Sequence, residues 1–273
     1  MPKVSVILPA YNCSAYLNDS ISSVLSQTFK DFELIVVDDG STDSTEKIVG
    51  RFSDARIIYK KRPHSGLSAS RNFGIDISRG EYIAFIDGDD IFLPEKLARQ
   101  VDAFTHFKDA DIVYTSEKFF YGNDWNILMD TPYEKLSGDL VYFLKRSNFI
   151  HISTVMIKRS ALMPLNFDQE LKSHEDWDFF LRLARDERRF LNLPDCLTLI
   201  RIRKDSMTAE GPVMDKSRRI VGKRAREIWS EIRDGMGIGS IRGWKLLRRY
   251  ASSKMKAGLM GFPKAARFNK PPR

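Results

Sequence analysis

Hydrophobic and polar residues alternate in blocks along the first half of the chain. Two runs rich in β-branched residues, at positions 4–8 and 32–37, have the length of buried strands, and polar residues follow each of them. Between these runs, Leu17, Ile21 and Val24 recur at the spacing of one helix face. The same cycle predicts helices over residues 45–52 and 68–77 and strands over residues 56–60 and 82–86. This alternation predicts an α/β fold, a mostly parallel, Rossmann-like sheet flanked by helices.

Small polar and acidic residues directly follow three of the predicted strands. They are Pro-Ala-Tyr-Asn at 9–12, Asp-Asp-Gly-Ser-Thr-Asp at 38–43 and Asp-Gly-Asp-Asp at 87–90. Ligands of open α/β sheets bind beyond the carboxyl ends of the strands, so these side chains are predicted to converge on one crevice. Each cluster alone is also typical of a turn or a helix cap. Three clusters in series at one edge of a sheet favour a binding site.

A second acidic cluster, Ser-His-Glu-Asp-Trp-Asp at 173–178, opens a predicted helix with an apolar stripe. Acids near a helix N-terminus are stabilised by the helix dipole, so capping is an alternative use of Glu175 and Asp178. Asp90 is in the same way a candidate cap for a helix that begins near Pro94.

Composition narrows the class of protein. The 273 residues are enough for one large α/β domain, and 42% hydrophobic with 29% charged residues exclude a disordered chain. Cys13 and Cys196 lie far apart, which excludes a CxxC-type zinc site and indicates a reducing compartment. No run approaches the roughly 18 apolar residues of a membrane span, and a strand pattern begins at residue 4, so a cytoplasmic protein is predicted.

Five motifs in order make the sequence similar to family 2 glycosyltransferases, which use nucleotide sugars and have the fold called GT-A. The motifs are VSVILPAYN at 4–12, IVVDDGSTD at 35–43, GLSASRNFGI at 66–75, FIDGDD at 85–90 and HEDWD at 174–178. The resemblance covers about residues 3–208 and implies a GT-A catalytic domain over residues 1–212. Within it, residues 1–116 are expected to hold the nucleotide sugar and metal, and residues 117–212 the acceptor and the catalytic base. A C-terminal helical extension over residues 213–273 follows.

The resemblance implies a donor site formed by the first motifs. Pro9, Tyr11 and Asn12 match the family's first nucleotide-contacting loop, and Asp38 and Asp39 match the pair that reaches the base and ribose. A carboxylate can accept a hydrogen bond from uracil N3–H or a ribose hydroxyl, and an aromatic ring can cover the base. A UDP-linked sugar is the expected donor, although these residue types do not discriminate among UDP, GDP and TDP.

Three arginines are implied near the donor. Arg71 matches the family's arginine that approaches the nucleotide, where a fixed cation near a diphosphate is favourable, and a surface arginine on a helix is the alternative. Residues 199–208 are similar to a family segment near the donor phosphates. Arg201 keeps its place there, whereas Arg203 replaces a histidine. A basic loop that faces water is the alternative for this segment.

The resemblance assigns the chemistry to two acidic motifs. Asp87 and Asp89 match the DxD motif, with Asp89 expected to ligate Mn²⁺ or Mg²⁺, Asp87 on the sugar–ribose side, and Gly88 leaving room for the ligand. Such a cation offsets the charge that grows on the leaving diphosphate. Asp176 matches the general base that takes the proton of the acceptor hydroxyl, which predicts inversion at the anomeric carbon.

The C-terminal extension is strongly basic. Residues 216–273 carry 17 basic and 3 acidic residues, a net charge of +14, so the rest of the chain is at −6 within the total of +8. One helix is predicted from about Val213, with its apolar positions at residues 220–232. A glycine-rich break at 235–239 and a second, basic amphipathic helix around Trp244 follow. Such a tail suits the anionic inner face of a membrane, and packing on the catalytic body is the alternative. Nucleic acid is not an expected partner, because no recognised motif accompanies the charge.

These observations predict a metal-dependent, inverting glycosyltransferase that acts on a glycan or lipid-linked acceptor in surface polysaccharide biosynthesis. A sugar-phosphate nucleotidyltransferase is one alternative, but it would have a glycine-rich loop where residues 9–12 stand. A non-catalytic nucleotide-sugar-binding or membrane-associated protein is the other. The enzymatic interpretation requires Asp89 and Asp176 to share one site.

Overall fold

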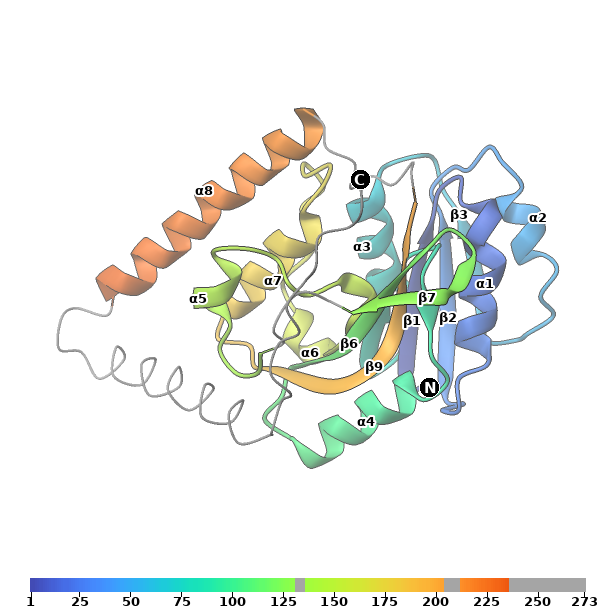
Figure 1. The fold of residues 1–273 in the computed structure, drawn as a ribbon, viewed down its shortest axis with the longest axis horizontal. Helices are drawn as coiled ribbons and strands as arrows, with labels where there is room; N and C mark the ends of the chain where they lie inside the picture. The colour runs from blue at the N-terminus through green and yellow to red at the C-terminus, as the bar shows by residue number, and fades with distance from the viewer. Residues whose placement is uncertain (131–135, 204–211, 236–273) are drawn as a thin grey trace.

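The computed structural model describes residues 1–130, 136–203 and 212–235 (Figure 1). In this part of the chain one mixed sheet has the strand order β3-β2-β1-β4-β8-β6-β9-β5, with β7 paired to β6. The strands are β1 (Val4–Ala10), β2 (Phe32–Asp38), β3 (Ile57–Lys61), β4 (Tyr82–Phe85), β5 (Ile91–Phe92), β6 (Ile112–Tyr121), β7 (Asp124–Asp130), β8 (Val155–Lys158) and β9 (Phe190–Ile202). The helices are α1 (Ser14–Leu25), α2 (Thr45–Val49), α3 (Leu67–Ile77), α4 (Lys96–His106), α5 (Val141–Leu144), the 3₁₀ turn η1 (Ile152–Thr154), α6 (Arg159–Leu162), α7 (Glu175–Arg185) and α8 (Pro212–Gly235).

The first half of the sheet is parallel, as the sequence predicts. Strand β1 pairs in parallel with both β2 and β4, and β2 pairs in parallel with β3. All residues of β1 and β2 are buried, which agrees with strands that are covered on both faces. The α/β fold and every element predicted in this half are confirmed.

The second half makes the sheet mixed. Strand β8 pairs antiparallel with both β4 and β6, and β5 pairs antiparallel with β9. The parallel arrangement therefore holds for β1 to β4 and is interrupted at β8. Because β8 has only four residues, its apolar pattern does not indicate a direction. Its position is important for the site, because β8 places the η1 turn beside the end of β4.

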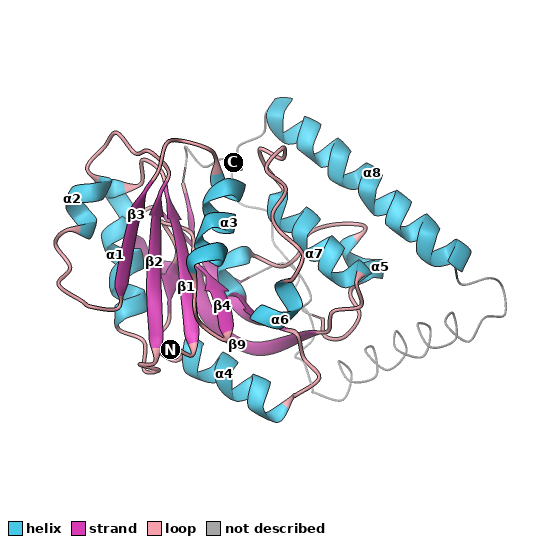
Figure 2. Ribbon diagram, turned by 180° about the vertical axis from the view of Figure 1, so that it is seen from behind, coloured by secondary structure: helices cyan, strands magenta, loops and turns pink. Residues whose placement is uncertain are grey.

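Two hydrophobic cores lie on opposite faces of the sheet. Val6 and Leu8 of β1 face α1 and α4, whereas Ile7 between them faces the core formed with α3, α5, α6, α7 and α8. This alternation is the two-residue period of a strand. Figure 2 shows α3 and α6 on the face nearest the viewer. The sheet edge at the ends of β1, β2 and β4 is left for polar loops.

Helix α8 confirms the first helix predicted in the C-terminal extension. Its apolar residues Val221, Ala225 and Ile228 are buried in the same core as α5 and α7. Arg224 pairs with Asp178 at 2.9 Å and with Asp168 at 2.7 Å. Helix α8 therefore packs on the catalytic body, as the alternative to membrane binding predicts. The second predicted helix lies outside the described residues. Among residues 214–232, whose side chains the structure describes in α8, the exposed basic residues are Lys216, Arg218, Arg219, Lys223 and Arg226.

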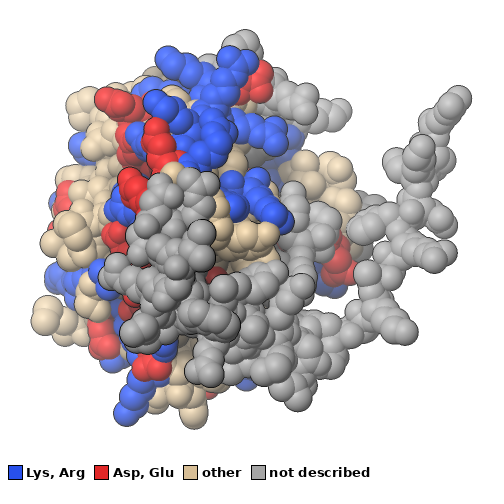
Figure 3. Space-filling model, turned by 90° about the vertical axis from the view of Figure 1, so that its left-hand side faces the viewer, with Lys and Arg blue, Asp and Glu red and all other residues tan. Residues whose placement is uncertain are grey.

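Figure 3 shows Lys and Arg side chains gathered on the side of the molecule that carries α8. Across the described residues, every helix is too short or too polar to span a lipid bilayer.

Candidate active site

The loops after β1 and β2 lie side by side, because Ala10 is in register with Asp38. The Asp38 side chain is fully buried and accepts hydrogen bonds from the Ser41 backbone N–H at 2.8 Å and the Tyr59 hydroxyl at 2.6 Å. The Asp39 carboxylate accepts from the backbone N–H groups of Ser65 and Gly66 at 2.9 and 2.8 Å. Both acids therefore order the loops at this edge, and their predicted contacts with a base and ribose stay predictions.

The predicted nucleotide-contacting loop presents an aromatic ring. Pro9 is the part of this loop that lies within β1, opposite Val37. Tyr11 is 49% exposed and stacks on the His64 ring with 4.2 Å between ring centroids. Asn12 has a positive φ of 47° and accepts a hydrogen bond from the Thr42 backbone N–H at 2.9 Å. The loops after β1 and β2 are thus joined, with one aromatic face open to solvent.

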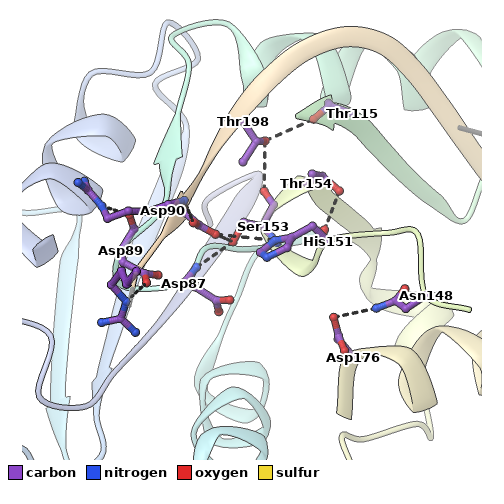
Figure 4. Close-up of polar contacts among 12 residues, drawn as sticks. Asp87, Asp89, Asp90, Thr115, Asn148, His151, Ser153, Thr154, Asp176 and Thr198 are labelled. Carbon is purple, nitrogen blue, oxygen red and sulfur yellow. Dashed lines mark hydrogen bonds and ion pairs between the residues drawn. The ribbon is translucent and has the colours of Figure 1, made fainter. Parts of the chain in front are cut away.

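The acidic turn after β4 is anchored to η1 through one serine (Figure 4). Ser153 Oγ accepts a hydrogen bond from the Asp87 backbone N–H at 3.0 Å and donates to Asp90 Oδ2 at 2.6 Å. Asp90 Oδ1 accepts from the Arg201 backbone N–H at 3.0 Å. The prediction that Asp90 caps the next helix is wrong, because its carboxylate is buried and held by Ser153 and Arg201, while α4 begins after Glu95.

Gly88 is needed for close packing as well as for any ligand. A Cβ atom at this position would lie 2.8 Å from Cys13 Sγ at the start of α1. Burial raises the pKa of Cys13 to about 12, so the thiol is neutral and acts as a small apolar group. The glycine therefore lets the acidic turn approach α1 closely.

Each carboxylate of the acidic turn has its own polar partner. Asp87 pairs with Arg71 NH2 at 2.8 Å, and Asp89 pairs with Arg203 Nε at 2.9 Å. Burial and the neighbouring Asp87 raise the pKa of Asp89, and burial and the other acids raise the pKa of Asp90 well above its usual range. Three acids in so small a volume favour the binding of a further cation.

The structure groups a set of atoms that fits such a cation. Asp87, Asp90 and His151 each offer one ligand atom, and these atoms all lie within 4.8 Å of one another. Carboxylate oxygens suit Mg²⁺ and Mn²⁺, and an imidazole nitrogen is a common ligand of transition metals. Asp89, the predicted ligand, is outside this group, because its side chain is paired with Arg203.

Arg71 joins the two acidic motifs. Its side chain is 1% exposed, and NH1 lies 2.6 Å from Glu175 Oε1 while NH2 lies 2.8 Å from Asp87 Oδ1. The alternative of a surface arginine is wrong. Because Glu175 directly precedes Asp176, this arginine fixes the start of α7 next to the end of β4. Direct contact of Arg71 with the nucleotide stays a prediction.

Asp176 lies in an environment that suits a base. Its Oδ2 accepts a hydrogen bond from Asn148 Nδ2 at 3.0 Å, and Oδ1 accepts from the Trp177 backbone N–H at 2.7 Å. Burial and the neighbouring Glu175 raise the pKa of Asp176 to about 6, against the lowering effect of Arg71 and His151. The carboxylate therefore has a higher proton affinity than an ordinary aspartate and is still ionised at neutral pH.

The neighbouring acids of this motif do not cap α7. Glu175 binds Arg71, and Asp178 is fully buried and pairs with Arg182 at 2.8 Å and Arg224 at 2.9 Å. Both residues lie in the first turn of α7, where the helix dipole favours negative charge, but the N-terminus of the helix has no side-chain capping hydrogen bond. Glu175 thus joins α7 to α3, and Asp178 joins α7 to α8 while also pairing with Arg182 of its own helix.

Arg201 and Arg203 face the acidic turn and not water. Arg201 donates from Nε to the Asp89 carbonyl at 2.8 Å and pairs with Asp19 at 3.1 Å. The guanidinium carbons of Arg201 and Arg203 lie 4.6 and 5.4 Å from the centre of the Tyr16 ring. The alternative of a water-facing basic loop is therefore wrong for these two residues, and their contact with donor phosphates stays a prediction.

Sequence reasoning missed three polar residues of the site. Asn148, His151 and Ser153 come from the segment before β8, where polar and apolar residues alternate. That alternation is a signal for a half-buried segment. It does not indicate that the segment lies against the acidic turn and Asp176.

Solved glycosyltransferases of the GT-A type have the same architecture. TarS residues 1–349 of S. aureus, in complex with UDP-GlcNAc, match with a TM-score of 0.65 at 22% identity, over 84% of this chain and 71% of that one. The mannosyltransferase PcManGT from Pyrobaculum calidifontis, in complex with GDP-Man and Mn²⁺, matches with a TM-score of 0.59 at 16% identity, over 95% and 83%. The fold, with acidic loops at its strand ends, is that of a GT-A glycosyltransferase.

The sequence comparison is more specific. The family model described as glycosyl transferase family 2 matches residues 5–164. The Escherichia coli UDP-Glc:α-D-GlcNAc-diphosphoundecaprenol β-1,3-glucosyltransferase WfaP is 34% identical over 215 residues, which cover 77% of this chain and 81% of that protein. The chain belongs to glycosyl transferase family 2, and the predicted family is confirmed.

Proposed function

We propose that this glycosyltransferase is inverting and metal-dependent, and that it transfers a sugar from a UDP-linked donor to a hydroxyl of a glycan or lipid-linked acceptor. The observation that carries this proposal is the double pairing of Arg71, which brings the DxD turn and the Asp176 motif together. The E. coli relative, whose name gives a UDP-linked donor and a diphosphoundecaprenol-linked acceptor, supports both substrate classes and a role in surface polysaccharide biosynthesis.

The donor is assigned to the loops after β1, β2 and β4. The exposed ring of Tyr11 is available to cover a base, and the adjoining loop ordered by Asn12, Asp38 and Asp39 lies where a nucleoside would enter. TarS with UDP-GlcNAc supports a uridine donor, although PcManGT holds a GDP-linked sugar.

The divalent cation is assigned to the acidic turn, and Mn²⁺ in PcManGT supports this assignment. Asp87, Asp90 and His151 would hold it, together with Asp89 once that side chain leaves Arg203. When bound, the cation supplies a positive charge that offsets the charge developing on the leaving diphosphate.

Asp176 is assigned as the general base. Asn148 and the Trp177 backbone N–H orient its carboxylate, which accepts the proton of the attacking hydroxyl. A single base that activates the acceptor on the face opposite the nucleotide produces inversion at the anomeric carbon.

Calorimetry with UDP, GDP, TDP and their sugars, with and without Mn²⁺, tests the donor and metal assignments. We expect UDP to bind best and more tightly with Mn²⁺ than without it, and Asp89→Ala to abolish this metal-dependent gain in affinity. Unchanged UDP affinity in this variant would reject the metal role of Asp89. Release of pyrophosphate from a nucleoside triphosphate and a sugar phosphate would instead support a nucleotidyltransferase.

The C-terminal extension is assigned to an anionic membrane surface at the inner face of the membrane. Helix α8 buries its apolar residues against the catalytic body. Over residues 214–232, five of its basic side chains are exposed to solvent and are therefore available to bind an anionic surface. The net charge of +14 over residues 216–273 supports this attachment. It would bring the enzyme to a lipid-linked acceptor.

A further inference from the structure

Each of the three acids of the acidic turn, Asp87, Asp89 and Asp90, already has polar partners within the protein. Asp87 pairs with Arg71, Asp90 is held by Ser153 and the Arg201 backbone N–H, and Asp89 pairs with Arg203. A divalent cation that binds here therefore competes with groups that are already in place.

The three sets of partners differ in how easily they can be exchanged. Arg71 is 1% exposed and is held from both sides by Asp87 and Glu175. Asp90 is 2% exposed and accepts from two donors on two different elements. Arg203 and Asp89 have side chains that are 19% and 18% exposed, and Arg203 lies one residue beyond the end of β9. The Arg203 side chain is thus more exposed than the Arg71 side chain, so the Arg203–Asp89 pair can separate with less disturbance of the core than the Arg71–Asp87 pair.

We propose that Arg203 is an internal counterion that holds Asp89 in the donor-free enzyme and exchanges partners when the donor binds. The guanidinium passes to the donor diphosphate while the Asp89 carboxylate passes to the divalent cation. This inference rests on the proposed donor and metal sites, and it adds that the two ligands depend on each other through one ion pair.

Electrostatics explains why the two events are coupled. If Asp89 turns to the cation alone, Arg203 loses one counterion in a mostly buried position, and if Arg203 turns to the diphosphate alone, Asp89 loses the positive charge beside it. When both ligands bind, both charges are compensated. Each ligand must therefore raise the affinity for the other by the same factor.

The residue type at position 203 fits this role. A guanidinium is always charged and can make two parallel hydrogen bonds to phosphate as well as to carboxylate. The family segment to which this part of the chain is similar has a histidine at this place, which is largely neutral at pH 7 and would hold a carboxylate less firmly. The Tyr16 ring, 5.4 Å from the Arg203 guanidinium, offers a cation–π contact that does not depend on either partner.

Binding measurements on the full chain test the exchange without any turnover. Mn²⁺ affinity is measured by electron paramagnetic resonance without and with UDP, and UDP affinity by calorimetry without and with Mn²⁺. For the wild-type protein we expect each ligand to strengthen the other by about 5-fold or more. In Arg203→Gln, Mn²⁺ alone should bind about 5-fold or more tightly than in wild type, and UDP alone should bind less tightly. The coupling factor should fall below the wild-type value, and the part that remains comes from direct attraction between the cation and the diphosphate.

Two further variants make the result interpretable. Arg203→Lys retains the charge and should keep part of the coupling. Arg99→Gln removes one positive charge from the exposed pair between Arg99 of α4 and Asp195 of β9 and should leave all four affinities unchanged. Mn²⁺ binding to Arg203→Gln that is unchanged or weaker, with wild-type coupling, overturns the exchange while leaving the proposed function intact. Wild-type protein that binds none of the nucleotides tested would instead reject the donor site itself.

Discussion

The environment of Asp176 predicts a pH dependence of turnover. Its pKa is raised to about 6, mainly by burial and by Glu175, so the carboxylate that acts as base is lost as the pH falls through about 6. We expect kcat to rise tenfold per pH unit below about pH 6 and to level off above it. Initial rates at saturating donor, acceptor and Mn²⁺ between pH 5 and 8 measure this profile. An inflection near pH 4 would contradict the raised pKa.

Replacement of Asp176 separates binding from chemistry. Asp176→Asn keeps the size of the side chain but cannot accept the proton, so turnover should fall by about 10²-fold or more while UDP affinity with Mn²⁺ stays within twofold of wild type. Asp178→Asn is the matched control, because this neighbour pairs with Arg182 and Arg224 and faces away from the proposed chemistry. It should reduce thermal stability and retain most of the turnover. Near-normal turnover in Asp176→Asn would assign the base elsewhere.

The buried pairing of Arg71 predicts a large loss of stability when the arginine is removed. Arg71→Met leaves Asp87 and Glu175 near each other without their common cation, which should cost about 3–5 kcal/mol. Urea denaturation followed by circular dichroism measures the change. Arg99→Met, which breaks the exposed pair with Asp195, should leave the denaturation midpoint unchanged. Equal effects of the two changes would mean that Arg71 is not a structural link between the motifs.

At the scale of elements, two helical glycines should respond in opposite ways to the same substitution. In α3, a Cβ atom at Gly74 would lie 2.5 Å from Ile7 Cγ2 of β1, so Gly74→Ala should push the helix off the sheet and destabilise the protein by about 1–3 kcal/mol. In α8, the nearest atom to a Cβ at Gly222 is Arg226 NH1 at 3.7 Å. Gly222→Ala should therefore stabilise by up to about 1 kcal/mol through helix propensity. Thermal unfolding of both variants checks the signs, and a stabilised Gly74→Ala would contradict the close packing of α3 on β1.

The elements that the sequence predicted are those with long, regular patterns. The apolar runs of β1 and β2 and the helix-spaced residues of α1 repeat over enough positions to be recognised. Strand β8 has four residues and takes its direction from its neighbours β4 and β6. Local sequence cannot specify such a strand, because its pairing depends on contacts with residues more than 40 positions away.

Part of the site could be predicted because its residues directly follow strands, as Asp87 and Asp89 follow β4. Asp176 opens a helix, and its predicted role comes from the resemblance of residues 174–178 to a family motif. Arg71 is also predicted as a site residue, but its pairing with Asp87 and Glu175 is not, and neither is the contact of Ser153 with the acidic turn, because these contacts depend on tertiary packing. The same cause explains why Asp90 was misread as a cap.

At the scale of the whole molecule, the distribution of charge predicts how the protein meets a membrane. The last 38 residues, 236–273, contain 10 basic and no acidic residues, so a chain that ends at Gly235 has a net charge of −2 instead of +8. The full chain should sediment with vesicles that contain phosphatidylglycerol and not with phosphatidylcholine vesicles. The shortened chain should lose most of this binding and keep its fold by circular dichroism. Sodium chloride at 0.5 M should release the full chain, because salt screens exposed charges.

Two outcomes would contradict attachment of the C-terminal extension to an anionic membrane. Sedimentation that is unaffected by the truncation would show that residues 236–273 are not needed. Sedimentation with neutral lipid alone would show that charge is not the cause.

The insertion of β8 between β4 and β6 has a consequence for laboratory recombination. A hybrid enzyme that joins the first 116 residues of one relative to the remainder of another creates four foreign strand borders at once. Two of them lie on either side of β8, which follows the turn that carries Ser153. Exchange of the surface loops after β1 and β2 leaves those borders intact. Attempts to transplant sugar-nucleotide preference between relatives should therefore graft loops and not halves.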